Sequence, residues 1–167
     1  MPVEDRYFED YPPGAVYEYG ETQVSAAEIV EFARRYDPQD MHVDPEKAAA
    51  GRFGGLIASG WHTAGMMMRL FADNFLPRNA SLASPGIDEL RWPRPVRPGD
   101  RLHIRVTVIE ATRSRSKPDR GMVRTLVEVL NQEGEVVMSL KPMNILRCRS
   151  PHPKPPPLAG EGMGGGR

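Results

Sequence analysis

The chain has 167 residues, and its 22 Lys and Arg residues balance its 22 Asp and Glu residues, so the formal net charge is zero. This length fits one domain, and the missing basic excess argues against a dedicated nucleic-acid-binding protein. The single cysteine, Cys148, excludes a disulfide within the chain. The sequence also lacks a secretory signal and the roughly 18 apolar residues of a membrane span. We therefore expect a soluble, cytoplasmic protein that binds neither nucleic acid nor membranes.

The first elements are a short strand and a helix. Residues 16–24 have the composition of a strand. Ser25 and Glu28 then have the spacing of a capping box, which marks the beginning of a helix. Pro38 disfavours the helical conformation of the residue before it, so this helix should end near Tyr36.

The segment after this helix places an aspartate and a histidine five residues apart, as Asp37 and His42. Asp44 and Pro45 follow as an N-cap and a first helical residue, opening a short helix through Ala50. A connection this short between two helices folds back on itself. We therefore expect Asp37 and His42 to face one pocket.

A glycine-rich segment, residues 51–60, leads into the longest predicted helix, residues 61–75. Three consecutive methionines, residues 66–68, broaden its apolar surface beyond the single stripe of a surface helix. This pattern predicts a helix enclosed on several sides, as it would be inside a curved sheet.

The second half of the chain predicts an antiparallel meander. Its four strands are expected at residues 86–92, 101–111, 121–130 and 135–147, with a hairpin at 131–134. Leu102, Ile104, Val106 and Val108 share one apolar face of their strand. Val123, Thr125, Val127 and Val129 form a second such set, which should face the long helix. Pro142 predicts a bulge or an edge position in the last strand. The elements together predict one α+β domain over residues 1–149.

The last residues, 150–167, are rich in proline and then in glycine. Such a composition buries too little apolar surface to offset the entropy of ordering the chain. We expect a disordered tail, with a proline-rich motif for a partner as the alternative.

Three motifs in this order resemble the MaoC-like (R)-specific enoyl-CoA hydratase family. They are the loop Asp37-Pro-Gln-Asp-Met-His42, the segment Gly55-Leu-Ile-Ala-Ser-Gly60, and the segment RWPRPVRPGDRL at residues 91–102. The resemblance covers residues 5–148. It implies a hot-dog fold, in which an antiparallel sheet wraps a long central helix. It also implies reversible addition of water to a trans-2-enoyl thioester of coenzyme A, in a homodimer or a dimer of dimers that shares the site across its interface.

The resemblance implies catalytic roles for Asp37 and His42, which together can hold one water and transfer its proton. It assigns the backbone N–H of Gly60 to the thioester oxygen, because a helix N-terminus offers free donors. Taken singly, each of these residues is more simply a turn, connection or packing residue. Their joint occurrence in family order favours the functional interpretation.

Residues around the start of the long helix are further candidates for the substrate pocket: Ser59, Trp61, Thr63 and Met68. Met68 departs from the family pattern, which often has a serine there that positions the catalytic aspartate. Ser59 and Thr63 are the nearby hydroxyls that can replace it. The three methionines are otherwise core residues, although methionine also suits a pocket for flexible chains.

Other features carry less information. His62 is expected at a surface or core position, with the pocket as the alternative, and His103 is expected to be exposed on the strand face opposite the apolar set. No His and Cys cluster has zinc-ligand spacing, so we expect no metal and no cofactor beyond coenzyme A as part of the substrate. Residues 113–120 form a basic hairpin tip that either attracts the phosphates of coenzyme A or is simply solvated. Two other functions stay open: a hot-dog thioesterase, and a non-catalytic acyl-CoA-binding protein whose support is Met68.

Overall fold

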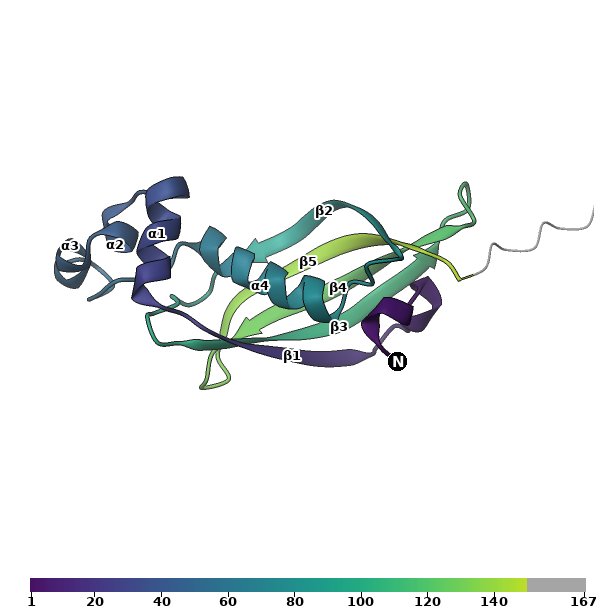
Figure 1. Ribbon diagram of the computed structural model, residues 1–167, viewed down its shortest axis with the longest axis horizontal. Coiled ribbons are helices and arrows are strands. Elements are labelled where there is room, and N and C mark those ends of the chain that lie inside the picture. The colour runs from purple at the N-terminus through teal and green to yellow at the C-terminus, as the bar shows by residue number, and fades with distance from the viewer. Residues whose placement is uncertain (150–167) are drawn as a thin grey trace, which may run out of the picture.

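The computed structural model describes residues 1–149, so the predicted disordered tail lies outside the described residues. Five strands form one antiparallel sheet in the order β1-β3-β4-β5-β2 (Figure 1). Their bounds are β1 Val16–Gln23, β2 Ser81–Arg91, β3 Arg101–Arg113, β4 Arg120–Leu130 and β5 Val136–Arg147.

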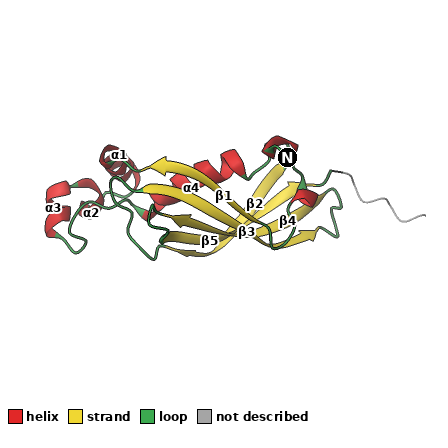
Figure 2. Cartoon of the chain, turned by 90° about the horizontal axis from the view of Figure 1, so that it is seen from below, coloured by secondary structure: helices red, strands yellow, loops and turns green. Residues whose placement is uncertain are grey.

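The helices are concentrated before the second strand. They are the 3₁₀ helices η1 Val3–Asp5 and η2 Phe8–Asp10, and the α-helices α1 Ala26–Tyr36, α2 Asp40–Val43, α3 Pro45–Ala50 and α4 Gly60–Asn74. The first three α-helices gather at one end of the sheet, whereas α4 runs along one of its faces (Figure 1). The long twisted strands are seen from below in Figure 2.

The helix ends follow the predicted signals. The hydroxyl of Ser25 accepts a hydrogen bond from the N–H of Glu28 at 3.1 Å, and α1 ends at Tyr36, directly before Asp37 and Pro38. The carboxylate of Asp44 caps α3 in the same way, with Pro45 as its first residue. These local signals therefore determine where the chain leaves α1 and enters α3.

The core lies between α4 and the face of the sheet that was predicted to be apolar. Both alternating sets of residues on β3 and β4 are fully or almost fully buried. Met67 and Phe71 of α4 pack into the same cluster, and the buried Tyr11 hydroxyl donates to the carbonyl of Phe75 at 2.6 Å. The predicted α+β hot-dog fold is confirmed.

One face of α4 remains open, so the predicted enclosure of this helix on several sides is wrong for a single chain. Trp61 is 59% exposed and Met68 is 44% exposed. The reason is that α4 packs on the β1–β3 side of the sheet, while the inner face of the outer strand β2 stays uncovered: Ile87 of β2 is 53% exposed.

Pro142 does not lie on an edge, because β5 is flanked by β4 and β2. It keeps regular register with β2 opposite Ile87. Between β4 and β5, Arg124 pairs with Met143 and the next pair is Val127 with Leu140, so Pro142 itself has no partner in this ladder. The missing N–H of proline is thus accommodated inside the sheet by a short gap in one ladder.

No helix among residues 1–149 has the length and apolar character needed to cross a membrane.

Candidate active site

Asp37 occupies the C-cap of α1, where its own N–H donates to the carbonyl of Ala33 at 2.8 Å. Both of its carboxylate oxygens accept hydrogen bonds. Ser59 donates its hydroxyl to Oδ2 at 2.7 Å, and Gln39 donates its side-chain amide to Oδ1 at 2.7 Å. The carboxylate is therefore held in one orientation from two sides.

His42 lies in α2, is 5% exposed, and turns its ring toward the same carboxylate. Its Nδ1 lies 2.7 Å from the carbonyl oxygen of Ile57, and because a carbonyl only accepts, Nδ1 carries the hydrogen. In the neutral ring this leaves the lone pair on Nε2, which lies 3.4 Å from Asp37 Oδ2. The predicted meeting of Asp37 and His42 is therefore present in the structure.

The turn that closes this five-residue separation is built from backbone bonds. The N–H of Gln39 donates to the carbonyl of Asp37 at 2.8 Å, and the N–H of His42 donates to the carbonyl of Gln39 at 2.9 Å. The chain thus reverses between α1 and α2, which brings together two side chains that a continuous helix would separate.

The electrostatics of the site favour an ionised Asp37. Its partial burial opposes ionisation, but the hydrogen bonds from Gln39 and Ser59 and the positive charge available on His42 outweigh burial. The pKa of Asp37 is consequently below its ordinary value. A carboxylate at this position is a hydrogen-bond acceptor throughout the neutral pH range.

Asp37 and His42 open onto a cavity of about 330 Å³. It is lined by Asp37, His42, Phe53, Ile57, Ala58, Gly60, Trp61, Thr63 and the segment from Trp92 to Val96. Apolar and aromatic side chains dominate the walls around one carboxylate–imidazole pair. This composition is typical of a site for a largely apolar substrate with one reacting polar centre.

Gly60 is the first residue of α4 and lies against the indole of Trp92. A Cβ at position 60 would lie 2.4 Å from Cε2 of that ring, so only glycine fits without movement of the ring. The indole N–H donates to the carbonyl of Gly60 at 3.0 Å, and the carbonyl of Val96 accepts from the N–H of Ala58 at 2.9 Å. The loop before β3 thereby fixes the backbone at the start of α4.

The other pocket candidates have different positions. Ser59 is fully buried and donates to Asp37, whereas Thr63 lines the cavity and directs its hydroxyl to the carbonyl of Ser59 at 3.5 Å. Trp61 also lines the cavity. Met68 does not line the cavity. Successive side chains on a helix differ in direction by about 100°, so Met67 points into the core and Met68 points away from the core.

Of the remaining histidines, His62 is buried and stacks on Phe32, with 4.9 Å between ring centroids, and His103 is half-buried on β3. Neither lines the cavity. No group of three or more His, Cys, Asp or Glu side chains within residues 1–149 has the arrangement of a metal site.

Sequence reasoning did not assign roles to Gln39 and Trp92. Gln39 stands at the third position of the Asp-x-Gln loop, so the motif itself carried the signal for its contact with Asp37. Trp92 belongs to the RWPRPVRPGDRL segment, but nothing in the linear sequence indicated that its ring covers Gly60, 32 residues earlier.

The family profile described as "MaoC like domain" matches residues 9–131. The chain belongs to the MaoC-like domain family. A Bacillus subtilis relative named "Uncharacterized protein YdeM" is 32% identical over 139 residues, covering 80% of this chain and 97% of that protein. The Mycobacterium tuberculosis 3-hydroxyacyl-thioester dehydratase Z is 35% identical over 94 residues, or 56% of this chain and 62% of that protein.

Solved structures of the family are also similar. The MaoC-like dehydratase from Rhodospirillum rubrum is 42% identical, with a TM-score of 0.81 over 87% of this chain and 99% of that one. The R-hydratase PhaJ1 from Pseudomonas aeruginosa is 25% identical, with a TM-score of 0.69 over 92% of this chain and 95% of that one. Both likenesses cover almost the whole of the related chain, so the shared unit is the complete hot-dog domain.

Proposed function

We propose that this MaoC-like chain catalyses the reversible addition of water to a trans-2-enoyl-CoA, giving a 3-hydroxyacyl-CoA. The observation that supports this is the pair of acceptors at the cavity, Asp37 Oδ2 and His42 Nε2, 3.4 Å apart. A water between them can donate one hydrogen to each. Its remaining lone pairs then point away from both groups, toward the cavity that would hold the β carbon.

The reaction balances with these groups alone. The water oxygen forms a bond to the β carbon, and the carboxylate–imidazole pair accepts the proton that the water loses. One proton returns from the pair to the α carbon, so the pair ends as it began. Positioned acid–base groups of this kind contribute about 10²–10⁴ in rate.

Negative charge accumulates on the thioester oxygen after the water adds to the β carbon and before the α carbon receives its proton. The N–H of Gly60 is available for this oxygen, because the first N–H groups of a helix have no partner within the helix. The positive end of the α4 dipole adds to the same effect. The contact between Trp92 and Gly60 keeps this donor in place.

The non-catalytic alternative rested on Met68 in place of a serine that positions the aspartate. Ser59 supplies that hydrogen bond from the N-cap of α4 instead. An acid–base pair held in this way supports an enzyme.

We further propose a homodimer formed through β2 and the open face of α4. β2 is the outer strand of the sheet, and its Leu82 and Ile87 are 37% and 53% exposed. Trp61 and Met68 add an uncovered apolar surface on α4. A second copy pairing along β2 removes the exposed edge and covers this surface.

The test is an assay of the purified protein with crotonyl-CoA, following loss of the enoyl-thioester absorbance and, in parallel, release of free thiol. Hydration predicts absorbance loss without thiol. The variants Asp37→Asn and His42→Gln should each lose at least about 10²-fold in kcat. His103→Gln is the matched control, because that histidine lies outside the cavity. Thiol release would instead establish a thioesterase, and binding without turnover a binding protein.

A further inference from the structure

One residue of β2 has a backbone conformation that is unusual for its type. Glu89 has a φ of +53°, and it is the only residue other than glycine with a positive φ among residues 1–149. Glycine adopts this left-handed region freely and asparagine tolerates it, whereas a residue such as glutamate is strained there. Strain of this kind persists only where the surrounding structure imposes it, and it is concentrated near functional sites. The contacts of β2 therefore hold Glu89 in a conformation that glutamate does not favour by itself.

The unusual conformation forms a β-bulge, in which two residues of β2 lie opposite one residue of β5. The pairs on either side of the bulge are Asp88 with Lys141 and Arg91 with Ser139. Between these pairs β2 has two residues, Glu89 and Leu90, and β5 has only Leu140. An extra residue in one strand bends that strand, and it changes the face on which the following side chains lie.

The side chains up to and including Glu89 are held on the side of the sheet away from α4. Asp88 bonds to Arg124 of β4 at 3.0 Å, and Glu89 bonds to Lys141 of β5 at 2.6 Å. Arg124 and Lys141 lie on that side because each alternates with the buried residues of its strand. Two consecutive side chains of β2 therefore point the same way, as expected at a bulge.

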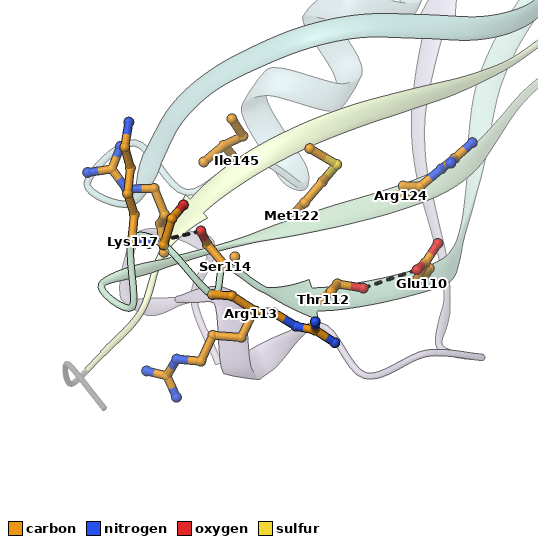
Figure 3. A pocket seen from close by; sticks show the side chains of 12 residues that line it. Glu110, Thr112, Arg113, Ser114, Lys117, Met122, Arg124 and Ile145 are labelled. Carbon is orange, nitrogen blue, oxygen red and sulfur yellow. Dashed lines mark hydrogen bonds between the residues drawn. The ribbon is translucent and has the colours of Figure 1, made fainter. Parts of the chain in front are cut away.

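The same side of the sheet carries a cavity of about 640 Å³ at the β3–β4 hairpin, drawn in Figure 3. Its cationic lining residues are Arg113, Arg115, Lys117, Arg120 and Arg124. The basic hairpin tip expected at residues 113–120 thus lines a cavity of its own, at the opposite end of the molecule from α1 to α3 (Figure 1). Among these residues, Arg124 bonds to Asp88 and so anchors β2 directly before the bulge.

The side chains after the bulge lie on the α4 side. Leu90 packs against the hydrophobic core, and the indole of Trp92 covers Gly60 at the start of α4. Regular alternation continued from Asp88 would place both of these side chains on the opposite side of the sheet. The bulge therefore decides that Trp92 faces α4.

The segment that begins at Trp92 forms one wall of the catalytic cavity. Residues 92–96 all line this cavity. The indole N–H of Trp92 donates to the carbonyl of Gly60 at 3.0 Å, and its ring lies 5.2 Å from the ring of Trp61, measured between centroids. The position of the Gly60 N–H, proposed above as the donor to the thioester oxygen, consequently depends on the direction in which the chain leaves β2.

We propose that Glu89 is a positioning residue for the hydration reaction, and that it acts through its backbone conformation and not through its carboxylate. The left-handed conformation forms the bulge, the bulge directs Trp92 to α4, and Trp92 holds the Gly60 donor. The ion pair between Glu89 and Lys141 is largely exposed and contributes little. The catalytic role of Glu89 rests on the proposed function, whereas the placement of Trp92 by the bulge does not.

The kinetic test varies how well position 89 tolerates the left-handed conformation. Glu89→Val and Glu89→Thr introduce β-branched side chains, which disfavour it and favour an extended backbone. Each should lower kcat for crotonyl-CoA by about 10²-fold, the cost of a displacement of about 1 Å in a catalytic group. Glu89→Gly and Glu89→Asn accept the conformation and should keep kcat within about twofold. Lys141→Ala, which removes the ion pair but leaves the bulge, is the matched control and should also keep kcat.

The position of Trp92 is measured without any substrate. The chain has two tryptophans, so labelling with 5-fluorotryptophan gives two ¹⁹F signals, and Trp61→Phe identifies which is which. The Trp92 signal should shift in Glu89→Val and Glu89→Thr, and should stay in place in Glu89→Gly, Glu89→Asn and Lys141→Ala. Urea denaturation of each variant establishes that the compared chains are folded.

The expected result is a loss of kcat together with a shifted Trp92 signal in the β-branched variants alone. A wild-type kcat or an unshifted signal in these variants would overturn the proposal. Equal losses in Glu89→Gly or Lys141→Ala would also overturn it, because the effect would then belong to the carboxylate. If both β-branched variants fail to fold, the bulge is needed for folding and its role in positioning is refuted. Absence of turnover in the wild type would refute the hydratase, and the ¹⁹F signals would still decide whether the bulge places Trp92.

Discussion

Ser59 contributes both to the stability of the fold and to the arrangement of the candidate site. Its hydroxyl donates to Asp37 Oδ2 at 2.7 Å and accepts from the N–H of Trp61 at 3.3 Å. Ser59→Ala removes both contacts at once. The first orients Asp37 of the proposed catalytic pair and the second caps α4, so two different measurements should respond.

The magnitudes follow from the two bonds. Hydrogen bonds to charged groups contribute about 1.5–3 kcal/mol, which corresponds to a loss of about 10- to 160-fold in kcat/KM if that energy orients Asp37 in the transition state. Loss of an N-cap costs about 1 kcal/mol in the free energy of unfolding. With one donor removed, the pKa of Asp37 should also rise, moving the acid limb of the kcat/KM profile to higher pH.

The assay is kcat/KM for crotonyl-CoA as a function of pH, together with urea denaturation. Ser25→Ala is the matched control, because Ser25 caps α1 through the N–H of Glu28 and does not contact Asp37. It should lose similar stability and keep full activity. If Ser59→Ala keeps wild-type kcat/KM and an unshifted acid limb while losing only stability, Ser59 is a structural cap and its role in the site is refuted.

Three further predictions concern the same framework. Gly60→Ala should lower kcat/KM by about 10²-fold, because the added Cβ meets the Trp92 ring and displaces the proposed oxyanion donor. The double variant with Trp92→Ala should recover part of that loss in the same crotonyl-CoA assay. Burial opposes the ionisation of Asp37, but the hydrogen bonds to its carboxylate and the charge of His42 hold its pKa below the ordinary value. The ionised carboxylate therefore stabilises the fold above the unfolded-state pKa, and this stabilisation is lost as pH falls through the folded-state pKa. Between about pH 5 and pH 2 the wild type should therefore lose more unfolding free energy than Asp37→Asn, and equal losses would contradict this sign. Phe71→Ala should lower the free energy of unfolding, measured by urea denaturation, by about 3–5 kcal/mol, because the Phe71 side chain of α4 is 2% exposed in the core. A smaller loss would show that the core contracts into the space left by the ring.

The local signals in the sequence were sufficient for most of the elements. Ser25 and Pro38 predicted where α1 begins and ends, and apolar alternation predicted the strands, because helix ends and strand faces depend on contacts within a few residues. Several elements departed from the prediction: η1, η2 and the short helix α2 around His42 were not predicted, and β2 was predicted from residue 86 but begins at Ser81. Its first residues are exposed and lack apolar alternation, so only pairing with β5 makes them a strand.

For the candidate site, the sequence by itself determined that Asp37 and His42 follow a helix exit and that a glycine opens the long helix. Which hydroxyl replaces the missing serine was decided only by the tertiary structure, since Ser59 and Asp37 are 22 residues apart and meet where α4 begins beside the α1–α2 turn. The exposure of Met68 and the cover of Trp92 over Gly60 likewise depend on how α4 is placed on the sheet. Such contacts depend on packing between segments that are distant in the sequence. Hydrophobic periodicity identifies a helix or strand and its apolar face, but not which segment packs against that face.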